Sequence, residues 1–275
     1  MKHLFTKLLL TASFLFPLTF VALGQKTSVE HSRVPVYLTA GAGVGMTDFF
    51  DAGVSPLHYH SLGLGVDMGL SVEWSRFRIT ADGRVIGGIA AYNRSDDNPG
   101  AYGITINPKV TFLCRVAEPA QGLRLYAGGS FDTYIDIRIN QKMMNAALGL
   151  TEMMGLDGNF RLEFDIPTRR RTDLFTLYAD IALPLFAVGE RPEYAYVYNA
   201  TSSSDPVEYL VDGYKMFFMG VPGATTDIGL LLNLKNGNRI GLSYIWNYRT
   251  TRHATTHRFD NASHIIKMYF MFNIN

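Results

Sequence analysis

The chain has 275 residues, of which 47% are hydrophobic, 13% aromatic and 18% charged, and its formal net charge is +1. A charge this close to zero argues against a nucleic-acid partner held by bulk electrostatics, and the hydrophobic content argues against a disordered chain. The single cysteine excludes an intramolecular disulfide and any metal cluster built from several cysteines.

The first 24 residues have the layout of a secretory signal peptide. Lys2 and Lys7 precede an apolar run that ends at Leu23, and Ala22 and Gly24 are small residues at the two positions that a signal peptidase reads. We expect cleavage before Gln25, a periplasmic tail over 25–33 and one domain over 34–275. The alternative is an N-terminal membrane anchor, for which the run is short. Cleavage removes two lysines and changes the formal net charge to −1.

From residue 34 onward, apolar residues recur at every second position, which is the period of a β-strand with two unlike faces. Leu62, Leu64 and Val66, for example, alternate with Gly63 and Gly65. Several runs have ten or more residues, the length of a tilted strand that crosses a bilayer, whereas strands of soluble proteins average about 5–6 residues. The pattern predicts ten strands, at 34–46, 58–73, 76–88, 102–116, 122–138, 172–187, 191–199, 225–235, 239–250 and 262–274.

One face of these strands is almost purely apolar, and the other carries glycine, serine, threonine and charged residues. This division suits a barrel whose apolar face meets lipid and whose polar face lines a lumen, and closure satisfies the backbone hydrogen bonds inside the bilayer. The sequence therefore predicts an all-β fold, a closed antiparallel up-and-down transmembrane β-barrel of about ten strands. Eight or twelve strands are the alternatives, because the segment 200–224 leaves the count open.

The connections between these strands alternate in length, with short turns in the periplasm and long loops outside, as expected of such a barrel. The short turns are predicted at 74–76, 117–122, 188–192 and 235–238, and the long loops at 47–57, 89–101, 139–171, 200–224 and 251–262.

Over roughly residues 34–275 the pattern resembles the bacterial outer-membrane β-barrel family, in particular its small single-chain members. The segment Ile265–Asn275 is similar to the C-terminal assembly signal of that family through Tyr269, Phe270 and Phe272, and departs from it by ending in Asn275. The resemblance implies export to the outer membrane, recognition by the barrel-assembly machinery, and contact with outer-membrane lipid and glycolipid. Two aromatic girdles are expected, with Trp74, Phe77, Phe270 and Phe272 at one membrane edge and Phe175, Trp246 and Tyr248 near the other.

Charged residues on the inward face form a nearly balanced set. They are Asp67, Glu73, Arg78, Asp82, Arg84, Lys109, Arg115, Arg124, Asp132, Asp136, Arg138, Asp180, Asp227, Arg249 and Lys267. Because barrels of about eight strands are filled by side chains and open channels need roughly sixteen, we expect these residues to close the lumen as an ion-pair network. The resulting hypothesis is a non-enzymatic structural or binding barrel whose external loops bind a protein or small-molecule ligand. A narrow channel for small solutes is the alternative.

A second alternative is an enzyme at the barrel rim that acts on outer-membrane lipid or peptide. His58 and His60 lie at the lip of the first external loop, where the second strand begins, and His253 and His257 lie in the last external loop; barrel closure would bring the two loops together. Such a rim site could use Asp51 or Asp260 as an acid or base partner. The chain has no Gly-x-Ser-x-Gly motif, and we expect no catalytic residues, metal or cofactor.

Two further features lie in the segment predicted as the third external loop. Met143, Ala147, Leu150 and Met154 have the spacing of a short amphipathic helix, which would pack on the rim or plug the mouth of the barrel. Arg169, Arg170 and Arg171 are candidates for contact with glycolipid phosphates, with a solvated charge run as the alternative.

Overall fold

The computed structural model describes residues 34–92, 101–140, 148–169, 173–192, 214–252 and 254–275. The expected signal peptide and periplasmic tail, at 1–24 and 25–33, lie outside the described residues. None of the described residues forms a helix long and apolar enough to cross a membrane.

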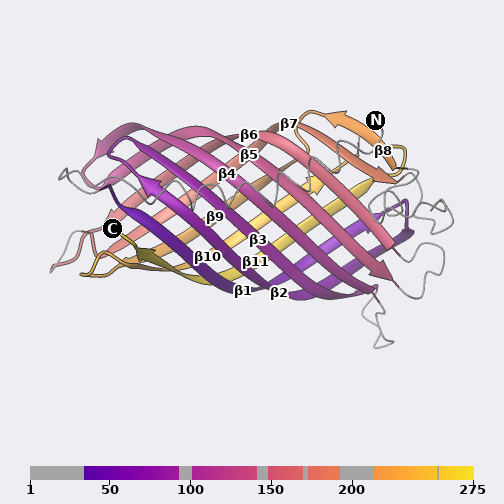
Figure 1. Ribbon diagram of the computed structural model, residues 1–275, viewed down its shortest axis with the longest axis horizontal. Coiled ribbons are helices and arrows are strands. Elements are labelled where there is room, and N and C mark those ends of the chain that lie inside the picture. The colour runs from indigo at the N-terminus through magenta and orange to yellow at the C-terminus, as the bar shows by residue number, and fades with distance from the viewer. Residues whose placement is uncertain (1–33, 93–100, 141–147, 170–172, 193–213, 253) are drawn as a thin grey trace.

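Eleven strands, all paired antiparallel, make up the fold (Figure 1). They are β1 (Val36–Asp51), β2 (Ser55–Glu73), β3 (Phe77–Tyr92), β4 (Ala101–Ala120), β5 (Leu123–Asn140), β6 (Leu148–Ile166), β7 (Phe175–Pro192), β8 (Tyr214–Met219), β9 (Gly223–Asn233), β10 (Arg239–Thr250) and β11 (Phe259–Asn273).

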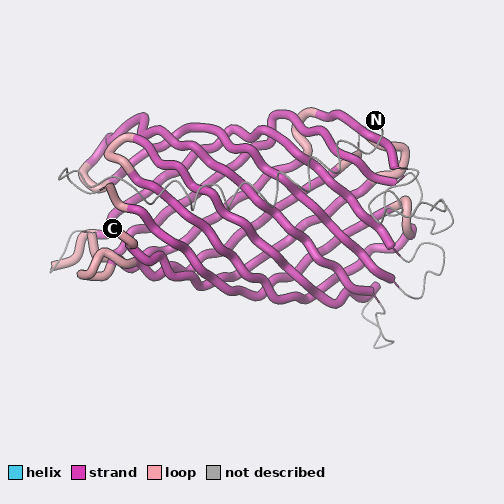
Figure 2. The backbone as a smooth tube through the Cα atoms, in the orientation of Figure 1, coloured by secondary structure: helices cyan, strands magenta, loops and turns pink. Residues whose placement is uncertain are grey.

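The sheet closes on itself as a barrel with ten wall positions. Each strand from β1 to β7 pairs with the next in the chain, β9, β10 and β11 continue the wall, and β11 returns to pair with β1. β8 and β9 share one position, because β8 pairs with residues 187–192 of β7 and β9 pairs with residues 175–182. Figure 2 shows the resulting lattice of tilted strands. The predicted fold class and the count of ten are confirmed.

One strand was missed, and one of the ten predicted strands is placed wrongly. The segment 139–171, predicted as a loop with a short helix, contains β6 over Leu148–Ile166, so Leu150 and Met154 belong to a strand; Met143 and Ala147 lie outside the described residues. β7 continues to Pro192, so it contains the predicted turn 188–192 and the first two residues of the strand predicted at 191–199. Residues 193–199 lie outside the described part of the chain. β6 replaces the strand predicted at 191–199, which is why the count of ten still holds.

The two ends of the barrel differ in their connections. The turn end carries the connections 74–76, 121–122, 167–174 and 234–238 and both ends of the described chain, where Asn275 donates to the carbonyl of Val34. Among the described residues, the loop end carries the connections 52–54 and 251–258. The first of them is only 52–54, in place of the predicted 47–57, because β1 and β2 stay paired to Asp51 and Ser55.

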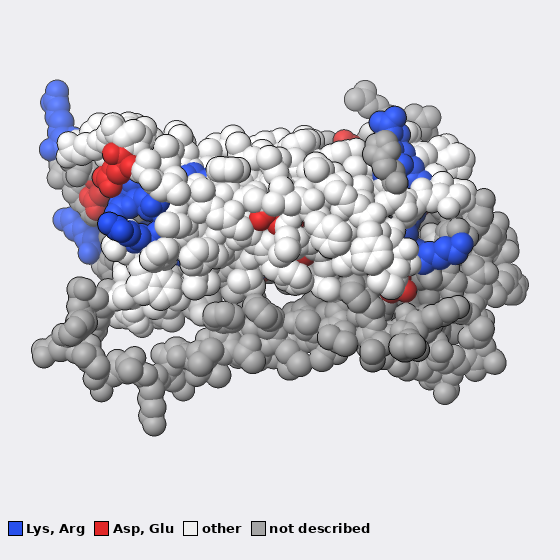
Figure 3. Space-filling view, turned by 90° about the horizontal axis from the view of Figure 1, so that it is seen from above, with Lys and Arg blue, Asp and Glu red and all other residues white. Residues whose placement is uncertain are grey.

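The outer and inner faces are as different as the alternation predicts. Leu62, Leu64 and Met68 are 69%, 73% and 67% exposed on the outside of β2, whereas Asp67 and Ser71 point inward and are 6% and 3% exposed. In the face shown in Figure 3, charged atoms gather toward the two ends and the surface between them is largely uncharged. An exposed apolar belt of this kind is stable only against lipid.

The aromatic girdles agree with the prediction except at one residue. Trp74, Phe77 and Phe272 lie at the turn end, and Trp246 stacks on Tyr248 toward the loop end. Phe175, predicted to lie with Trp246, begins β7 at the turn end instead. The error follows from the missed strand β6, because omitting one strand reverses the direction assigned to the next.

Candidate functional site

The lumen of the turn-end half contains two adjacent cavities. The outer one, about 420 Å³, opens at the turn end and is lined by residues that include Tyr37, Arg124, Tyr126 and Lys235. The inner one, about 200 Å³, is lined by residues of ten strands, and thirteen of these residues are charged. Glu73, Arg78, Leu231 and Arg239 belong to the walls of both cavities.

A chain of ion pairs crosses the lumen between the two cavities. Glu73 on β2 accepts from Arg239 on β10 and pairs with Arg78 on β3. Arg78 extends to Glu163 on β6, with Nη1 2.7 Å from Oε1. The carboxylate of Glu163 also accepts from Arg124 and Arg161. Since Glu163 is only 3% exposed, three guanidinium groups offset the cost of burying its charge.

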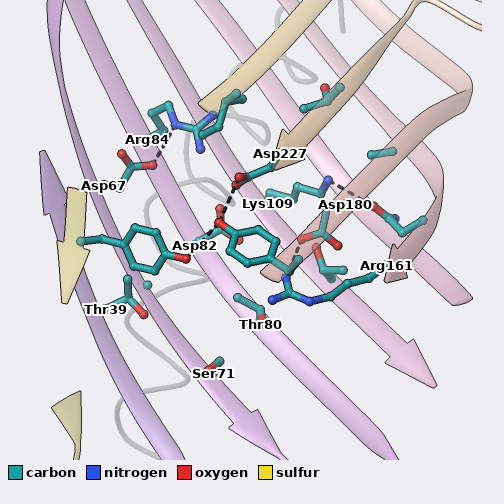
Figure 4. A pocket seen from close by; sticks show the side chains of 18 of the residues that line it. Thr39, Asp67, Ser71, Thr80, Asp82, Arg84, Lys109, Arg161, Asp180 and Asp227 are labelled. Atoms are coloured by element: carbon teal, nitrogen blue, oxygen red, sulfur yellow. Dashed lines mark hydrogen bonds and ion pairs between the residues drawn. The ribbon is translucent and has the colours of Figure 1, made fainter. Parts of the chain in front are cut away.

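A second layer lies deeper in the inner cavity (Figure 4). Asp67 accepts from Arg84 at 2.8 Å and from Lys267 at 3.2 Å, and Asp180 accepts from Arg161. Lys109 lies near Asp157 and Asn159 on β6. Figure 4 shows Asp82 and Asp227 facing the same space.

Two tyrosines from β7 and β11, three wall positions apart, meet in the same cavity. The hydroxyl of Tyr269 on β11 donates to that of Tyr178 on β7 at 2.9 Å, and Tyr178 donates to Asp227 at 3.0 Å. Each ring lies against a glycine: a Cβ on Gly229 would be 2.6 Å from the Tyr178 hydroxyl, and one on Gly241 would be 2.1 Å from Cζ of Tyr269. Only glycine leaves room for these rings across the lumen.

Above the inner cavity the lumen narrows to a polar constriction. Arg249 on β10 reaches Asp132 on the opposite wall, β5. Next to this pair a space of only about 10 Å³ remains, lined by Arg84 and by mostly uncharged side chains, among them Thr105, Asn107, Asn247 and Asn261. Such a space holds about one water molecule.

Aromatic and arginine side chains close the loop end of the lumen; we call this group the loop-end seal. The guanidinium of Arg138 lies between two rings, 3.8 Å from the centroid of Phe49 and 4.6 Å from that of Phe259. Arg191 lies over the ring of Phe259 at 5.4 Å and pairs with Asp51 at 2.5 Å. The remaining members are Tyr134, Met153 and Phe217, which cluster with Phe259. Phe259 has no exposed surface and Arg191 is 2% exposed.

The structure brings most of the predicted lumen charges into contact with a partner. Asp136 pairs with Arg138. Ten other predicted residues also have a partner of opposite charge: Asp67, Glu73, Arg78, Arg84, Lys109, Arg124, Asp132, Asp180, Arg249 and Lys267. Asp82 lines the inner cavity, and Asp227 accepts from Tyr178. Arg115 is apart from this network, because it pairs with Glu118 at the turn-end rim.

Several lumen residues were missed, four of them because β6 was missed and three because they lie at or beyond the predicted ends of β1, β7 and β10. They are Asp51, Asp157, Arg161, Glu163, Asp165, Arg191 and Arg239. A signal for three of them was present: between Leu156 and Ile166, Phe160, Leu162 and Phe164 alternate with polar residues as strictly as in any other strand.

Of the predicted rim histidines, His58 and His60 do not converge with Asp51 or Asp260. The first and last loop-end connections are neighbours, since Ala52 donates to the carbonyl of Arg258 at 2.9 Å. His58 and His60 project from the outer face, however, where His58 stacks on Phe50 at 4.7 Å and His60 pairs with Asp48. Asp51 is instead held by Arg191, and Asp260 pairs with Arg258. His253 lies outside the described residues. Within the described part of the chain, no group of three metal-ligating side chains could hold an ion.

Arg169 lies at the turn end, in the connection between β6 and β7, and Arg170 and Arg171 lie outside the described residues. The predicted contact with outer-leaflet glycolipid assumed a long external loop at this place. Since 167–174 is a short turn-end connection, its position does not support that contact.

Comparison with known proteins gives structural likenesses of low sequence identity. No family model and no curated protein matches the sequence. Among solved structures, the transport unit of the autotransporter AIDA-I from Escherichia coli is 8% identical, with 96% of this chain and 98% of that chain covered and a TM-score of 0.42. The translocator domain of the autotransporter NalP from Neisseria meningitidis is 11% identical, with 95% and 97% covered and a TM-score of 0.37. The toluene transporter TodX of Pseudomonas putida is 9% identical, with 87% and 90% covered and a TM-score of 0.33.

The class of the protein follows from its own geometry. A closed barrel of ten positions, apolar outside and charged inside, is a transmembrane β-barrel of the outer-membrane type.

Proposed function

We propose that the protein is a closed, non-enzymatic outer-membrane barrel, with its turn end in the periplasm and its loop end outside the cell. Its lumen serves stability, and its external connections bind a protein or small-molecule ligand. The loop-end seal is the observation that carries this proposal, because it places a fully buried phenylalanine and two nearly buried arginines across the external end of the lumen.

The seal is difficult for an ion to pass. An ion that enters the lumen from the turn end must first pass the ion pairs at Arg78 and then the pair between Arg249 and Asp132. It then meets buried aromatic rings, among which an unpaired charge is strongly disfavoured. A pathway through this end requires Phe259, the first residue of β11, to move.

Planar-bilayer recording tests the proposal. We expect the protein, refolded in detergent and inserted into a bilayer, to give no reproducible discrete openings. Heat-modifiable gel migration confirms that the inserted sample is a folded barrel, and a known porin in the same bilayer confirms that insertion is detected. Regular unitary openings of the folded protein would contradict a closed lumen and favour the second function.

The second candidate function is a narrow channel for small solutes. The two cavities favour it, because together they reach from the turn end to the polar constriction, so that only the constriction and the seal separate them from the loop end. A channel of this design would conduct only when the seal is displaced.

Location and assembly partners are part of the same proposal. The apolar outer face supports contact with outer-membrane lipid, and the aromatic residues of β11 support recognition of the chain by the barrel-assembly machinery. Protease protection of the folded protein in intact cells, compared with cells whose outer membrane has been opened, tests the orientation. Cleavage restricted to the loop-end connections in intact cells is the expected result.

A further inference from the structure

A groove lies on the outer face of the barrel at the turn end, where β3 begins and β4 ends. It has a volume of about 460 Å³, and its walls are Arg76 in the connection before β3, Phe77 at the start of β3, and residues 114–118 of β4. All of these residues belong to the described part of the chain. We call this site the turn-end groove.

The groove exists because β4 is longer than β3 at this end. Pairing between the two strands ends at Phe77 opposite Cys114, and one more bond joins the amide of Arg115 to the carbonyl of Arg76 at 2.7 Å. β4 continues to Ala120, and among the described residues no strand pairs with its β3 side beyond that bond. On the other side, the register with β5 shifts twice between Arg115 and Ala120. Such bulges bend a strand, and the irregular end of β4 forms one wall of the groove.

The groove carries a net positive charge. Arg115 pairs with Glu118, with Nη1 3.1 Å from Oε2, and the side chain of Glu118 is 48% exposed. Arg76 is exposed and has no ion-pair partner within the described ranges. Two guanidinium groups and one carboxylate leave a formal charge of +1, which complements a ligand with a single negative charge. A phosphodiester is such a ligand, and guanidinium groups bind phosphate oxygens through paired hydrogen bonds.

The apolar part of the groove continues into the lipid-facing belt. Phe77 is 44% exposed and stacks on the exposed Phe112, with ring centroids 5.8 Å apart. Trp74, in the same connection as Arg76, is 43% exposed. An exposed tryptophan at the end of such a belt marks the level of the lipid headgroups. The cations of the groove therefore lie at the level of lipid phosphates, and Phe77 and Phe112 lie where the acyl chains begin.

We propose that the turn-end groove binds one anionic glycerophospholipid, with its phosphodiester at Arg76 and Arg115 and an acyl chain along Phe77 and Phe112. The occupant is anionic because Glu118 is already paired with Arg115, so that the charge of Arg76 is left for the ligand. The inference rests on the proposed orientation, which assigns the lipid to the periplasmic leaflet. In vesicles whose two leaflets are alike, its failure would leave that orientation and the closed lumen untouched.

Tryptophan quenching tests the proposal, because Trp74 is two residues from Arg76 and the chain has one other tryptophan. Trp246→Phe, which keeps Trp74 alone, is refolded into dioleoylphosphatidylcholine vesicles. The vesicles contain brominated phosphatidylglycerol or brominated phosphatidylcholine at the same mole fraction. Trp74→Phe keeps Trp246 alone, toward the loop end of β10, and reports on lipid that contacts the barrel away from the groove.

We expect phosphatidylglycerol to be preferred over phosphatidylcholine at Trp74 by at least about threefold, as one unpaired arginine at a membrane surface provides, and not to be preferred at Trp246. Adding Arg76→Gln should abolish the preference. Lys235→Gln is the matched control, because it also removes an exposed cation at the turn end, outside the groove, and should leave the preference intact. No preference at Trp74, an equal preference at both tryptophans, or a preference that Lys235→Gln removes as fully as Arg76→Gln would each overturn the site.

Native mass spectrometry of the unsubstituted protein gives a second measurement that does not depend on the folding of any variant. The folded barrel is released from detergent micelles that contain equal amounts of phosphatidylglycerol and phosphatidylethanolamine, and we expect one phosphatidylglycerol to be retained preferentially. Phosphatidylethanolamine is the competitor because its ammonium group offers Glu118 a partner. Retention of phosphatidylethanolamine instead, or of both lipids in equal amounts, would refute an anionic occupant.

Discussion

Arg78 and Glu163, 85 residues apart in the chain, meet across the lumen with Nη1 2.7 Å from Oε1. Arg78 comes from β3 and Glu163 from β6, so the pair ties two separate parts of the barrel wall together. The side chain of Glu163 is 4% exposed and that of Arg78 is 11% exposed.

Removing Arg78 should destabilise the barrel strongly. We expect Arg78→Met to lower the free energy of unfolding by about 3 kcal/mol, because it leaves a buried carboxylate with one cation fewer. Arg78→Met combined with Glu163→Gln should recover part of this loss. Urea unfolding in lipid vesicles, followed by tryptophan fluorescence, measures the difference.

Arg115→Met is the control. Arg115 pairs with the half-exposed Glu118, so this substitution should lower the free energy of unfolding by less than about 1 kcal/mol. Equal losses for Arg78→Met and Arg115→Met would show that the cross-lumen pair has no special weight.

A methyl group at Gly241 should prevent correct packing of the lumen. The new Cβ of Gly241→Ala would be 2.1 Å from Cζ of Tyr269, so the ring must leave its place and lose its bond to Tyr178. We expect a smaller fraction of folded barrel in unheated gel samples, and partial rescue by adding Tyr269→Ala. Gly87→Ala is the matched control, because a Cβ there meets nothing within 4 Å. If Gly241→Ala folds as well as Gly87→Ala, the close approach of Tyr269 to this glycine is wrong.

Opening the loop-end seal should create conductance where the native protein has none. Phe259→Ala removes a ring with no exposed surface, which should cost about 3–5 kcal/mol and leave a gap beside Arg138. We expect small unitary steps in planar bilayers from the folded fraction. Phe272→Ala, which removes an exposed ring from the outer face at the turn end, should stay silent. A silent Phe259→Ala barrel would mean that the layers below the seal also block the lumen.

The two tryptophans should report different depths in the bilayer. Trp246 lies within β10, on its outer face, whereas Trp74 follows the last residue of β2 at the turn end. In Trp74→Phe, the remaining Trp246 should be quenched efficiently by lipids brominated on their acyl chains and weakly by aqueous acrylamide. In Trp246→Phe, the remaining Trp74 should show relatively more quenching by acrylamide. The opposite order would shift the membrane belt along the barrel and contradict the placement of the girdles.

The strand pattern is legible in the sequence because the period of a strand is local. Asp132 and Asp136 alternate with apolar neighbours on the same segment, so their inward direction follows from parity alone. The barrel class follows as well, since strands of this length with one apolar face have to close in lipid.

β6 shows where this reasoning fails. Leu150 and Met154 are four residues apart, a spacing that a helix also produces, and Glu152 between them interrupts the apolar face. Pairing with β5 over 17 residues fixes this segment as a strand, from Leu123 opposite Phe164 to Ile139 opposite Leu148. Periodicity is a property of one segment, so it carries no information about the strand with which that segment pairs.

The sequence by itself determined that this protein is a two-faced β-barrel with a charged lumen, because residue alternation alone assigns each side chain to lipid or to the interior. Only the tertiary structure decided which charges meet, as with Arg191 and Asp51 at a separation of 140 residues, and which end of the lumen is closed. It also showed that β8 and β9 share one wall position and are joined at Val221. These features depend on how the tilted strands are staggered when the sheet closes, and the stagger is set by pairing between distant segments, which no local pattern encodes.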